Sequence, residues 1–369
     1  MSALSGLRVL DLTRLLPGPF CSLLLADFGA DVIKVEDLGA GDYARADPPA
    51  FAALNRGKRS VRLDLKSAGG RDAFLRLARR ADVVLESFRP GVLDRLGVGW
   101  EALHAENPRL VYCAITGYGQ DGPLRDRAGH DLNYLARAGL LALSGEADGP
   151  PVQSAGQIAD LGGGALMAAF GILAALRSGE GQFVDVAMAD GALSWLAMPA
   201  AAVLAEGRSA RRGELTLGGS LVCYRPYRCA DGWISIGALE PKFWAAFCEG
   251  VGRRDLVPHQ FDPPGSDAHA EVASIVAGRT RAEWEAFNGE HDCCVEPVYE
   301  LEEALADEHF RARGMIGERA LGAPVKLSAT PAAPDGAAPG PGEHTDAVLA
   351  EAGFAEAEIA ALRAAGAIA

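Results

Sequence analysis

Residues 7–35 read LRVLDLTRLLPGPFCSLLLADFGADVIKV, and this stretch decides the fold. Two short apolar runs, 7–12 and 31–35, flank a helical window that follows Pro17-Gly18-Pro19 and extends to Phe28. Because a helical crossover joins the two runs, they are predicted to be parallel strands of one sheet.

The same alternation continues along the first half of the chain. Further strand-like runs are 61–65, 82–85, 110–115 and 182–188, and helical windows cover 70–79 and 161–177. Strands that alternate with helices predict an α/β, Rossmann-like domain built on a doubly wound parallel sheet. No Gly-x-Gly-x-x-Gly follows the first strand, so a nicotinamide dinucleotide is not expected.

The pattern changes at about residue 221. Two strand-like runs there flank an Asp231-Gly232 turn and predict a hairpin, and helical windows follow, which together are typical of a small α+β domain. The predicted organisation is a large domain over 1–190, a linker containing one long helix over 191–220, the small domain over 221–325, and a proline-rich linker with two terminal helices over 326–369.

Composition limits the class of protein. The 369 residues carry a formal net charge of −14, which argues against a nucleic-acid-binding surface. Seven scattered cysteines match neither a disulfide framework nor a zinc ribbon, so no metal site and a reducing compartment are expected. No leader pattern is evident, and apolar stretches such as 165–176 look too short to span a bilayer. We expect a cytoplasmic protein without a membrane or nucleic-acid partner.

Three short motifs carry groups that move protons. They are Gly129-His130-Asp131, Asp160 before Leu161-Gly162-Gly163-Gly164, and Glu240 before Pro241. Each also has a purely structural explanation, because Asp131, Asp160 and Glu240 all stand where a helix is expected to start. One helix is predicted over 133–141, after Asp131, and another over 161–177, after Asp160. The first backbone amides of the second helix would be free to bind a ligand oxygen.

The chain resembles the family III CoA-transferases and, within them, the α-methylacyl-CoA racemases. The resemblance covers nearly the whole chain and rests on several stretches together. They are LSGLRVLD (4–11), DFGADVIKVE (27–36), LDLK (63–66), ESFRPG (86–91), TGYGQDGP (116–123) and the tail around Gly353-Phe354 and Glu358-Ile359. The family implies an interlocked homodimer in which the large domain includes both termini and binds CoA.

The resemblance also implies a reaction. Racemases carry Gly-His-Asp where transferases commonly show Gly-Tyr-Asp, and this chain has His130 at that place. His130 and Asp160 would then remove and return the α-proton of a 2-methylacyl-CoA from opposite faces, while Glu240, from the partner subunit, hydrogen-bonds the imidazole. The chain would act in fatty acid and lipid metabolism, on a branched fatty acyl, bile-acid or terpenoid thioester.

Two other functions stay open at this point. A family III CoA-transferase would use Asp160 as a nucleophile and form an acyl anhydride, and a non-catalytic protein would only bind acyl-CoA. The family implies no cofactor beyond the CoA of the substrate. Residues expected near CoA, from the resemblance or from their place beside these motifs, are Arg14, Leu63, Lys66, Phe88, Arg89, Arg95 and Tyr134. Asp37 departs from relatives, which often have Pro or Arg there, and puts the contacts to adenosine in doubt.

Overall fold

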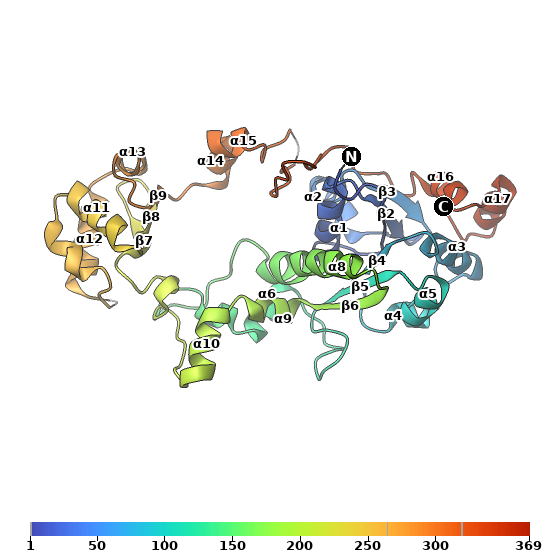
Figure 1. The fold of residues 1–369 in the computed structure, drawn as a ribbon, viewed down its shortest axis with the longest axis horizontal. Helices are drawn as coiled ribbons and strands as arrows, with labels where there is room; N and C mark the ends of the chain where they lie inside the picture. Colours follow the sequence, from blue (N-terminus) through green and yellow to red (C-terminus); the bar gives the residue numbers. More distant parts are fainter. Residues whose placement is uncertain (1, 264, 319) are drawn as a thin grey trace. The chain divides into compact units, whose positions relative to one another are not determined.

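The computed structural model describes residues 2–263, 265–318 and 320–369. The chain forms two compact units, whose elements are labelled in Figure 1. The first unit consists of Met1–Ala138, Ser154–Trp195 and His309–Ala369, and the second of Gly139–Gln153 and Leu196–Glu308. The second unit thus includes the short segment 139–153, which the sequence pattern had placed in the large domain. The predicted domain boundaries stay predictions.

A six-stranded parallel sheet forms the centre of the first unit. Its strands are β1 (Arg8–Asp11), β2 (Asp31–Glu36), β3 (Arg59–Arg62), β4 (Val83–Glu86), β5 (Val111–Thr116) and β6 (Gln182–Ala187). They lie in the order β3-β2-β1-β4-β5-β6, and every neighbouring pair is parallel. The predicted Rossmann-like fold is confirmed. The order reverses between β1 and β4, and ligands of such sheets bind at the carboxyl ends of the strands beside this reversal.

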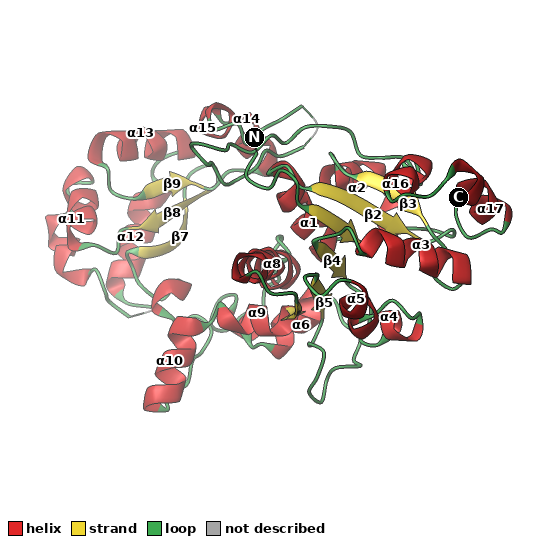
Figure 2. Cartoon of the chain, turned by 45° about the vertical axis from the view of Figure 1, so that its right-hand side comes forward, coloured by secondary structure: helices red, strands yellow, loops and turns green. Residues whose placement is uncertain are grey.

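Helices cover the sheet. The helices of this unit used below are α1 (Pro17–Asp27), α3 (Ala68–Ala78), α4 (Val92–Arg95), α6 (Asp131–Arg137), the π-helix η2 (Ile158–Leu166), α8 (Met167–Ser178), α9 (Met188–Ser194), α16 (Thr345–Glu351) and α17 (Glu356–Ala364). The others are η1 (Tyr43–Ala46), α2 (Pro48–Asn55), α5 (Trp100–Glu106) and α15 (Glu308–Ala312). Helix α1 packs against β1 and β2, and α8 packs against β5 and β6. Figure 2 shows the strands of this sheet with helices around them.

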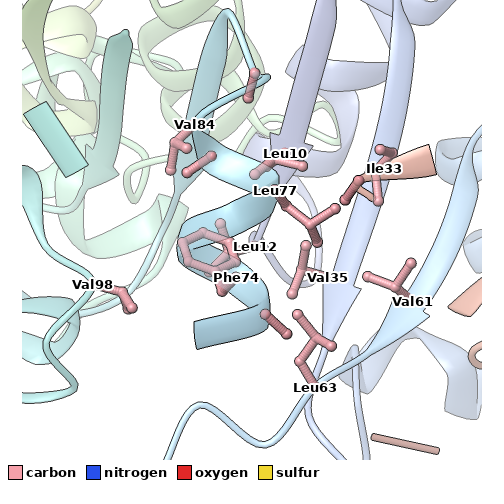
Figure 3. Close-up of a cluster of buried hydrophobic side chains, with 14 of the residues drawn as sticks. Leu10, Leu12, Ile33, Val35, Val61, Leu63, Phe74, Leu77, Val84 and Val98 are labelled. Carbon is pink, nitrogen blue, oxygen red and sulfur yellow. The ribbon is translucent and has the colours of Figure 1, made fainter. Parts of the chain in front are cut away.

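The main hydrophobic core lies between the sheet and α3. Leu10, Ile33 and Val84 of three neighbouring strands gather with Phe74 and Leu77 of α3, and all five side chains are buried (Figure 3). The end of the chain adds to the same core through buried side chains of α16 and α17, namely Val348, Leu349 and Ile359. Near-continuous apolar strands are typical of a parallel sheet that is covered on both faces.

The second unit is built on a small antiparallel sheet. Its elements are α7 (Leu140–Leu143), α10 (Ala197–Glu206), η3 (Thr216–Gly218), β7 (Tyr224–Arg228), β8 (Trp233–Gly237), α11 (Pro241–Gly250), η4 (Arg254–His259), α12 (Asp267–Ala277), α13 (Arg281–His291), β9 (Val295–Pro297) and α14 (Leu301–Ala306). Strands β7 and β8 pair across the Asp231-Gly232 turn, which confirms the predicted hairpin. Stacked rings of Trp244, Phe247 and Trp284 fill its core.

Three predicted helices differ in the structure. The single long helix expected in the 191–220 linker is instead two helices, α9 and α10, separated at Trp195 and Leu196, where the chain passes from the first unit to the second. The helix expected over 133–141 stops at Arg137, because Gly139 adopts a φ of 84° and a new helix, α7, starts after it. Positive φ favours glycine and ends a helix.

The third difference is the helix expected over 161–177. It begins three residues earlier, as η2, and continues through α8 to Ser178. Together they form one apolar helix of 21 residues, which by length and composition alone could cross a membrane. The expectation that no apolar segment here is long enough is therefore wrong.

A buried ionic network supports the loop between β1 and α1. The Lys34 ammonium lies 2.7 Å from Asp42, and that of Lys58 lies 3.3 Å from Asp11, with all four side chains fully buried. The Asp42 carboxylate also accepts a hydrogen bond of 2.9 Å from the Leu15 amide. Leu15 has a φ of 64°, so the network holds this loop in a backbone conformation that non-glycine residues rarely adopt.

We expect Lys34→Met to lower the free energy of unfolding by about 3–5 kcal/mol, because it leaves the Asp42 carboxylate buried without its charge partner. Urea unfolding of both proteins measures the difference. Lys66→Met, at an exposed position, is the control and should change stability by no more than about 0.5 kcal/mol. Adding Asp42→Asn to Lys34→Met should recover part of the loss, and a single variant as stable as the wild type would contradict the role given to this pair.

Candidate functional site

Two cavities open at the carboxyl ends of the strands in the first unit. The first, here the His130 cavity, has a volume of about 680 Å³ and is lined by residues after β1, β4 and β5 together with His130 and Asp160. The second, here the Lys66 cavity, has a volume of about 700 Å³ and lies beyond β1, β2 and β3. Arg14 and Phe88 line both cavities, so the two adjoin beside the reversal in strand order.

His130 and Asp160 reach the same cavity from different elements. His130 is the residue before α6, and its amide donates a hydrogen bond of 3.0 Å to the Asn133 side chain. Its imidazole is exposed. Asp160 is the third residue of η2 and is partly buried. The structure thus places one imidazole and one carboxyl group on the wall of a single cavity.

The Asp160 carboxyl has an unusual affinity for protons. Burial and, to a lesser degree, the nearby Asp131 carboxylate raise the pKa of Asp160 to about 6, and His130 acts in the opposite direction. A carboxyl group with a pKa near the working pH can both accept and donate a proton. This property suits general acid–base chemistry, and it also marks a group that is held in a cleft away from water.

The role of Asp131 in the site was not predicted from the sequence. It was expected to cap the helix that follows it, but its carboxylate instead accepts hydrogen bonds from the amides of Ala159 (2.7 Å) and Asp160 (3.0 Å). Asp131 therefore caps η2 and fixes the backbone that carries Asp160. The sequence contained one signal, an acidic residue beside His130, but its partner lies 28 residues away along the chain.

The amides around Asp160 in η2 are not free as expected. Besides the two amides bound by Asp131, the Leu161 amide donates to the Gln157 carbonyl at 2.9 Å. The expectation that Asp160 caps the helix is also wrong, because it lies inside η2. The glycines serve helix packing: a Cβ on Gly163 would lie 2.8 Å from the Met188 carbonyl oxygen of α9.

Tyr134 and Arg89, which were expected to lie near CoA, also line the His130 cavity. The Tyr134 hydroxyl donates a hydrogen bond of 2.5 Å to the Gly129 carbonyl, which ties α6 to the residue before His130. Burial, with help from the Asp160 charge, raises the pKa of Tyr134 to about 12, so the hydroxyl stays protonated. Arg125 and Arg127 line the same cavity but were not predicted as site residues. The only signal in the sequence was their position between the motif at 116–123 and Gly129-His130-Asp131.

The Lys66 cavity collects the other predicted CoA residues. Leu63 and Lys66 line it together with Arg14 and Phe88, and Asp37 lies on the same wall. Arg95, on α4, is exposed and lines neither cavity. Leu63 is buried and offers a flat apolar contact, whereas the charged Lys66 is exposed. Among the described residues, no group of three or more His, Cys, Asp or Glu is placed to hold a metal ion.

A family model described as CoA-transferase family III matches residues 4–345. The chain belongs to this family. Its relatives include two kinds of enzyme. The α-methylacyl-CoA racemase of Mus musculus is 40% identical, with 96% of this chain and 95% of that protein covered. The succinyl-CoA:mesaconate CoA-transferase of Haloarcula marismortui is 36% identical, with 96% and 97% covered.

Solved structures agree with this family III assignment. A CAIB/BAIF family protein from Brucella suis matches with a TM-score of 0.83 and 32% identity, covering 95% of this chain and 99% of that one. Sequence and structure therefore establish an enzyme of family III. Because racemases and CoA-transferases both occur among the relatives, the choice between the two reactions depends on the site.

Glu240, the third residue expected from this family resemblance, belongs to the second unit. It directly precedes α11, as predicted, and its side chain is exposed. Gln260 donates hydrogen bonds to the carbonyls of Ala238 (3.0 Å) and Leu239 (2.9 Å) and so fixes the backbone leading to Glu240. The catalytic role of Glu240 stays a prediction.

Proposed function

We propose that this chain is an α-methylacyl-CoA racemase, which inverts the configuration of 2-methylacyl-CoA thioesters through an enolate. The observation that carries the proposal is that His130 and Asp160 line one cavity, with the pKa of Asp160 raised to about 6. The 40% identity to the racemase of Mus musculus supports it. No cofactor beyond the CoA of the substrate belongs to the proposal.

Each direction of the reaction uses the two groups in opposite roles. When Asp160 removes the α-proton, protonated His130 returns a proton to the other face of the planar enolate; in reverse, neutral His130 removes it and Asp160 returns it. In the proposal, the amides of Asp131 and Leu132 at the start of α6, for which the described part of the chain offers no acceptor, would bind the enolate oxygen. Asp131 positions Asp160 and raises its pKa.

The proposal includes an interlocked homodimer. In this arrangement Glu240 of one chain approaches His130 of the other, accepts a hydrogen bond from the imidazole and supports its protonated form. Exposed apolar side chains support a protein partner, since Leu166, Phe170 and Leu173 form one exposed face of the η2–α8 helix and Phe170 is 72% exposed. Apolar faces of this kind are typical of subunit interfaces.

CoA transfer is the second candidate function. The favouring observation is that transferases such as the succinyl-CoA:mesaconate enzyme are also similar to this chain. Asp160 would then attack the thioester carbonyl, release CoA as a thiolate and hold the acyl group as an anhydride. His130 has no necessary part in that reaction. A protein that binds acyl-CoA without catalysis would leave the raised pKa of Asp160 without a use.

Racemisation and CoA transfer can be distinguished because only CoA transfer requires a carboxylate acceptor such as succinate. A 2-methylacyl-CoA of one configuration is incubated with the enzyme, with and without succinate, and its configuration and CoA distribution are followed. Loss of configuration without any acceptor is the expected result. Transfer of CoA to succinate, with configuration retained when the acceptor is omitted, would replace the racemase by the transferase.

We expect Asp131→Asn to shift the pH profile of racemisation. The pair works with one proton between His130 and Asp160. Below about pH 6 the Asp160 carboxylate is protonated and can no longer act as the base, so kcat/KM should fall about tenfold per pH unit. The asparagine side chain keeps an oxygen for the Ala159 and Asp160 amides but removes the charge that raises the pKa of Asp160. The acid limb of kcat/KM should therefore move to lower pH. An unchanged limb would show that Asp131 does not set this pKa.

A further inference from the structure

Arg14 occupies the junction between the two cavities and is already held there. Its guanidinium lies 2.6 Å from Asp37 and donates a hydrogen bond of 3.1 Å to the Tyr43 hydroxyl. It also lies over two aromatic rings, 5.1 Å from the ring centre of Tyr43 and 5.2 Å from that of Phe88. A planar cation between rings, with a carboxylate at one edge, has a fixed place.

The two oxygens of Asp37 have separate tasks. Oδ1 accepts hydrogen bonds from the amides of Gly39 (2.8 Å) and Gly41 (3.1 Å), which shapes the loop after β2, and Oδ2 contacts Arg14. Arg62 fixes the same loop through the carbonyls of Asp37 and Gly39. An uncharged side chain with an oxygen at this place could still accept from the Gly39 and Gly41 amides, whereas the ion pair with Arg14 requires the charge of Asp37.

Other charges at the Lys66 cavity do not compete for Arg14. Glu36 pairs with Arg45 at 2.6 Å and accepts a hydrogen bond from Ser60, so its carboxylate is occupied. Asp64 accepts from the Lys66 amide at 3.0 Å. Among the described residues, Asp37 is the carboxylate that forms an ion pair with Arg14.

We propose that Asp37 is a built-in competitor for the pyrophosphate of CoA at Arg14, and that Arg14 leaves Asp37 when CoA binds. The inference rests on the proposed function for the identity of the ligand. With adenosine in the Lys66 cavity and the thioester in the His130 cavity, the pyrophosphate that joins these ends crosses the junction at Arg14. Phosphate oxygens and the Asp37 carboxylate would seek the same guanidinium edge. Asp37 thus lowers the affinity for CoA.

Asp37→Asn tests the competition, because Asn can keep the bonds to Gly39 and Gly41 while it removes the charge. Calorimetric titration with CoA at low salt should give a Kd lower than that of the wild type by about 1.4- to 5-fold, the range expected for a partly exposed ion pair. The gain should shrink at high salt. Asp37→Ala, which also loses the loop bonds, is the control for loop shape and should not reproduce the full gain.

Two further titrations make the test specific. The Arg14→Ala variant should itself bind CoA more weakly. Adding Asp37→Asn to it should not lower the Kd for CoA, because the guanidinium for which Asp37 and the pyrophosphate compete is absent. Dephospho-CoA lacks the 3′-phosphate but keeps the pyrophosphate, so the gain should persist with it. A weaker or unchanged Kd for Asp37→Asn, an equal gain without Arg14, or a gain lost with dephospho-CoA would overturn the proposal. Failure of the wild type to bind CoA at all would instead count against the proposed function.

Discussion

Replacing Asp160 by Asn should lower the rate of racemisation by about 10²- to 10⁴-fold, the usual contribution of a positioned acid–base group. Asn has nearly the same shape but neither accepts nor donates the proton. The Asp160 backbone amide still bonds to Asp131, so η2 should keep its place. Chiral analysis of 2-methylacyl-CoA over time measures the rate, and calorimetry should show unchanged binding of CoA.

The control for this variant is Asp121→Asn, an exposed acidic residue of the same unit that lines neither cavity. Its activity should equal that of the wild type. Because Asp160 is also the nucleophile of the alternative reaction, its loss removes both functions. Racemisation that survives in Asp160→Asn at more than about a tenth of the wild-type rate would contradict a direct role in proton transfer.

His130→Ala should also lower racemisation by about 10²- to 10⁴-fold, and it separates the two candidate reactions. An anhydride mechanism at Asp160 has no need of an imidazole, so a transferase would keep most of its activity. The variant should fold, since His130 is exposed and its bond to Asn133 comes from its main-chain amide. Both rates, racemisation and transfer of CoA to succinate, are measured on the same preparation.

His259→Ala is the matched control, an exposed histidine of the second unit. It should leave racemisation unchanged. If His130→Ala retained wild-type racemisation, the two-group mechanism would be wrong. If transfer to succinate were the main activity of the wild type and survived in this variant, the transferase interpretation would take its place.

The parallel sheet could be predicted from sequence because its strands are short, apolar and separated by helical windows. The runs at 7–12 and 31–35 correspond to β1 and β2, each with one or two residues of difference at its ends. The β7–β8 hairpin followed from its Asp-Gly turn. These signals are local, and the observed strand pairing agrees with them.

The features missed depend on contacts between distant segments. A cap on η2 supplied by Asp131 cannot be read from residues near η2, and the π-helical start of η2 has the same apolar pattern as an α-helix. The break between α9 and α10 lies in a mostly apolar segment in which Pro199 stands in the first turn of α10, a signal that was not used in predicting one long helix. Asp37 was singled out from the family resemblance, but its pairing with Arg14 required the fold to bring two loops together.

The most direct test of the account is α-proton exchange by the wild-type enzyme. A 2-methylacyl-CoA of one configuration is incubated in deuterated buffer without any carboxylate acceptor, and NMR and chiral analysis follow the α-position. Deuterium should enter the α-position as the configuration is lost, because a proton delivered by His130 or Asp160 would come from groups that exchange with the buffer. Retention of both the α-hydrogen and the configuration, while CoA moves to succinate once it is added, would contradict it.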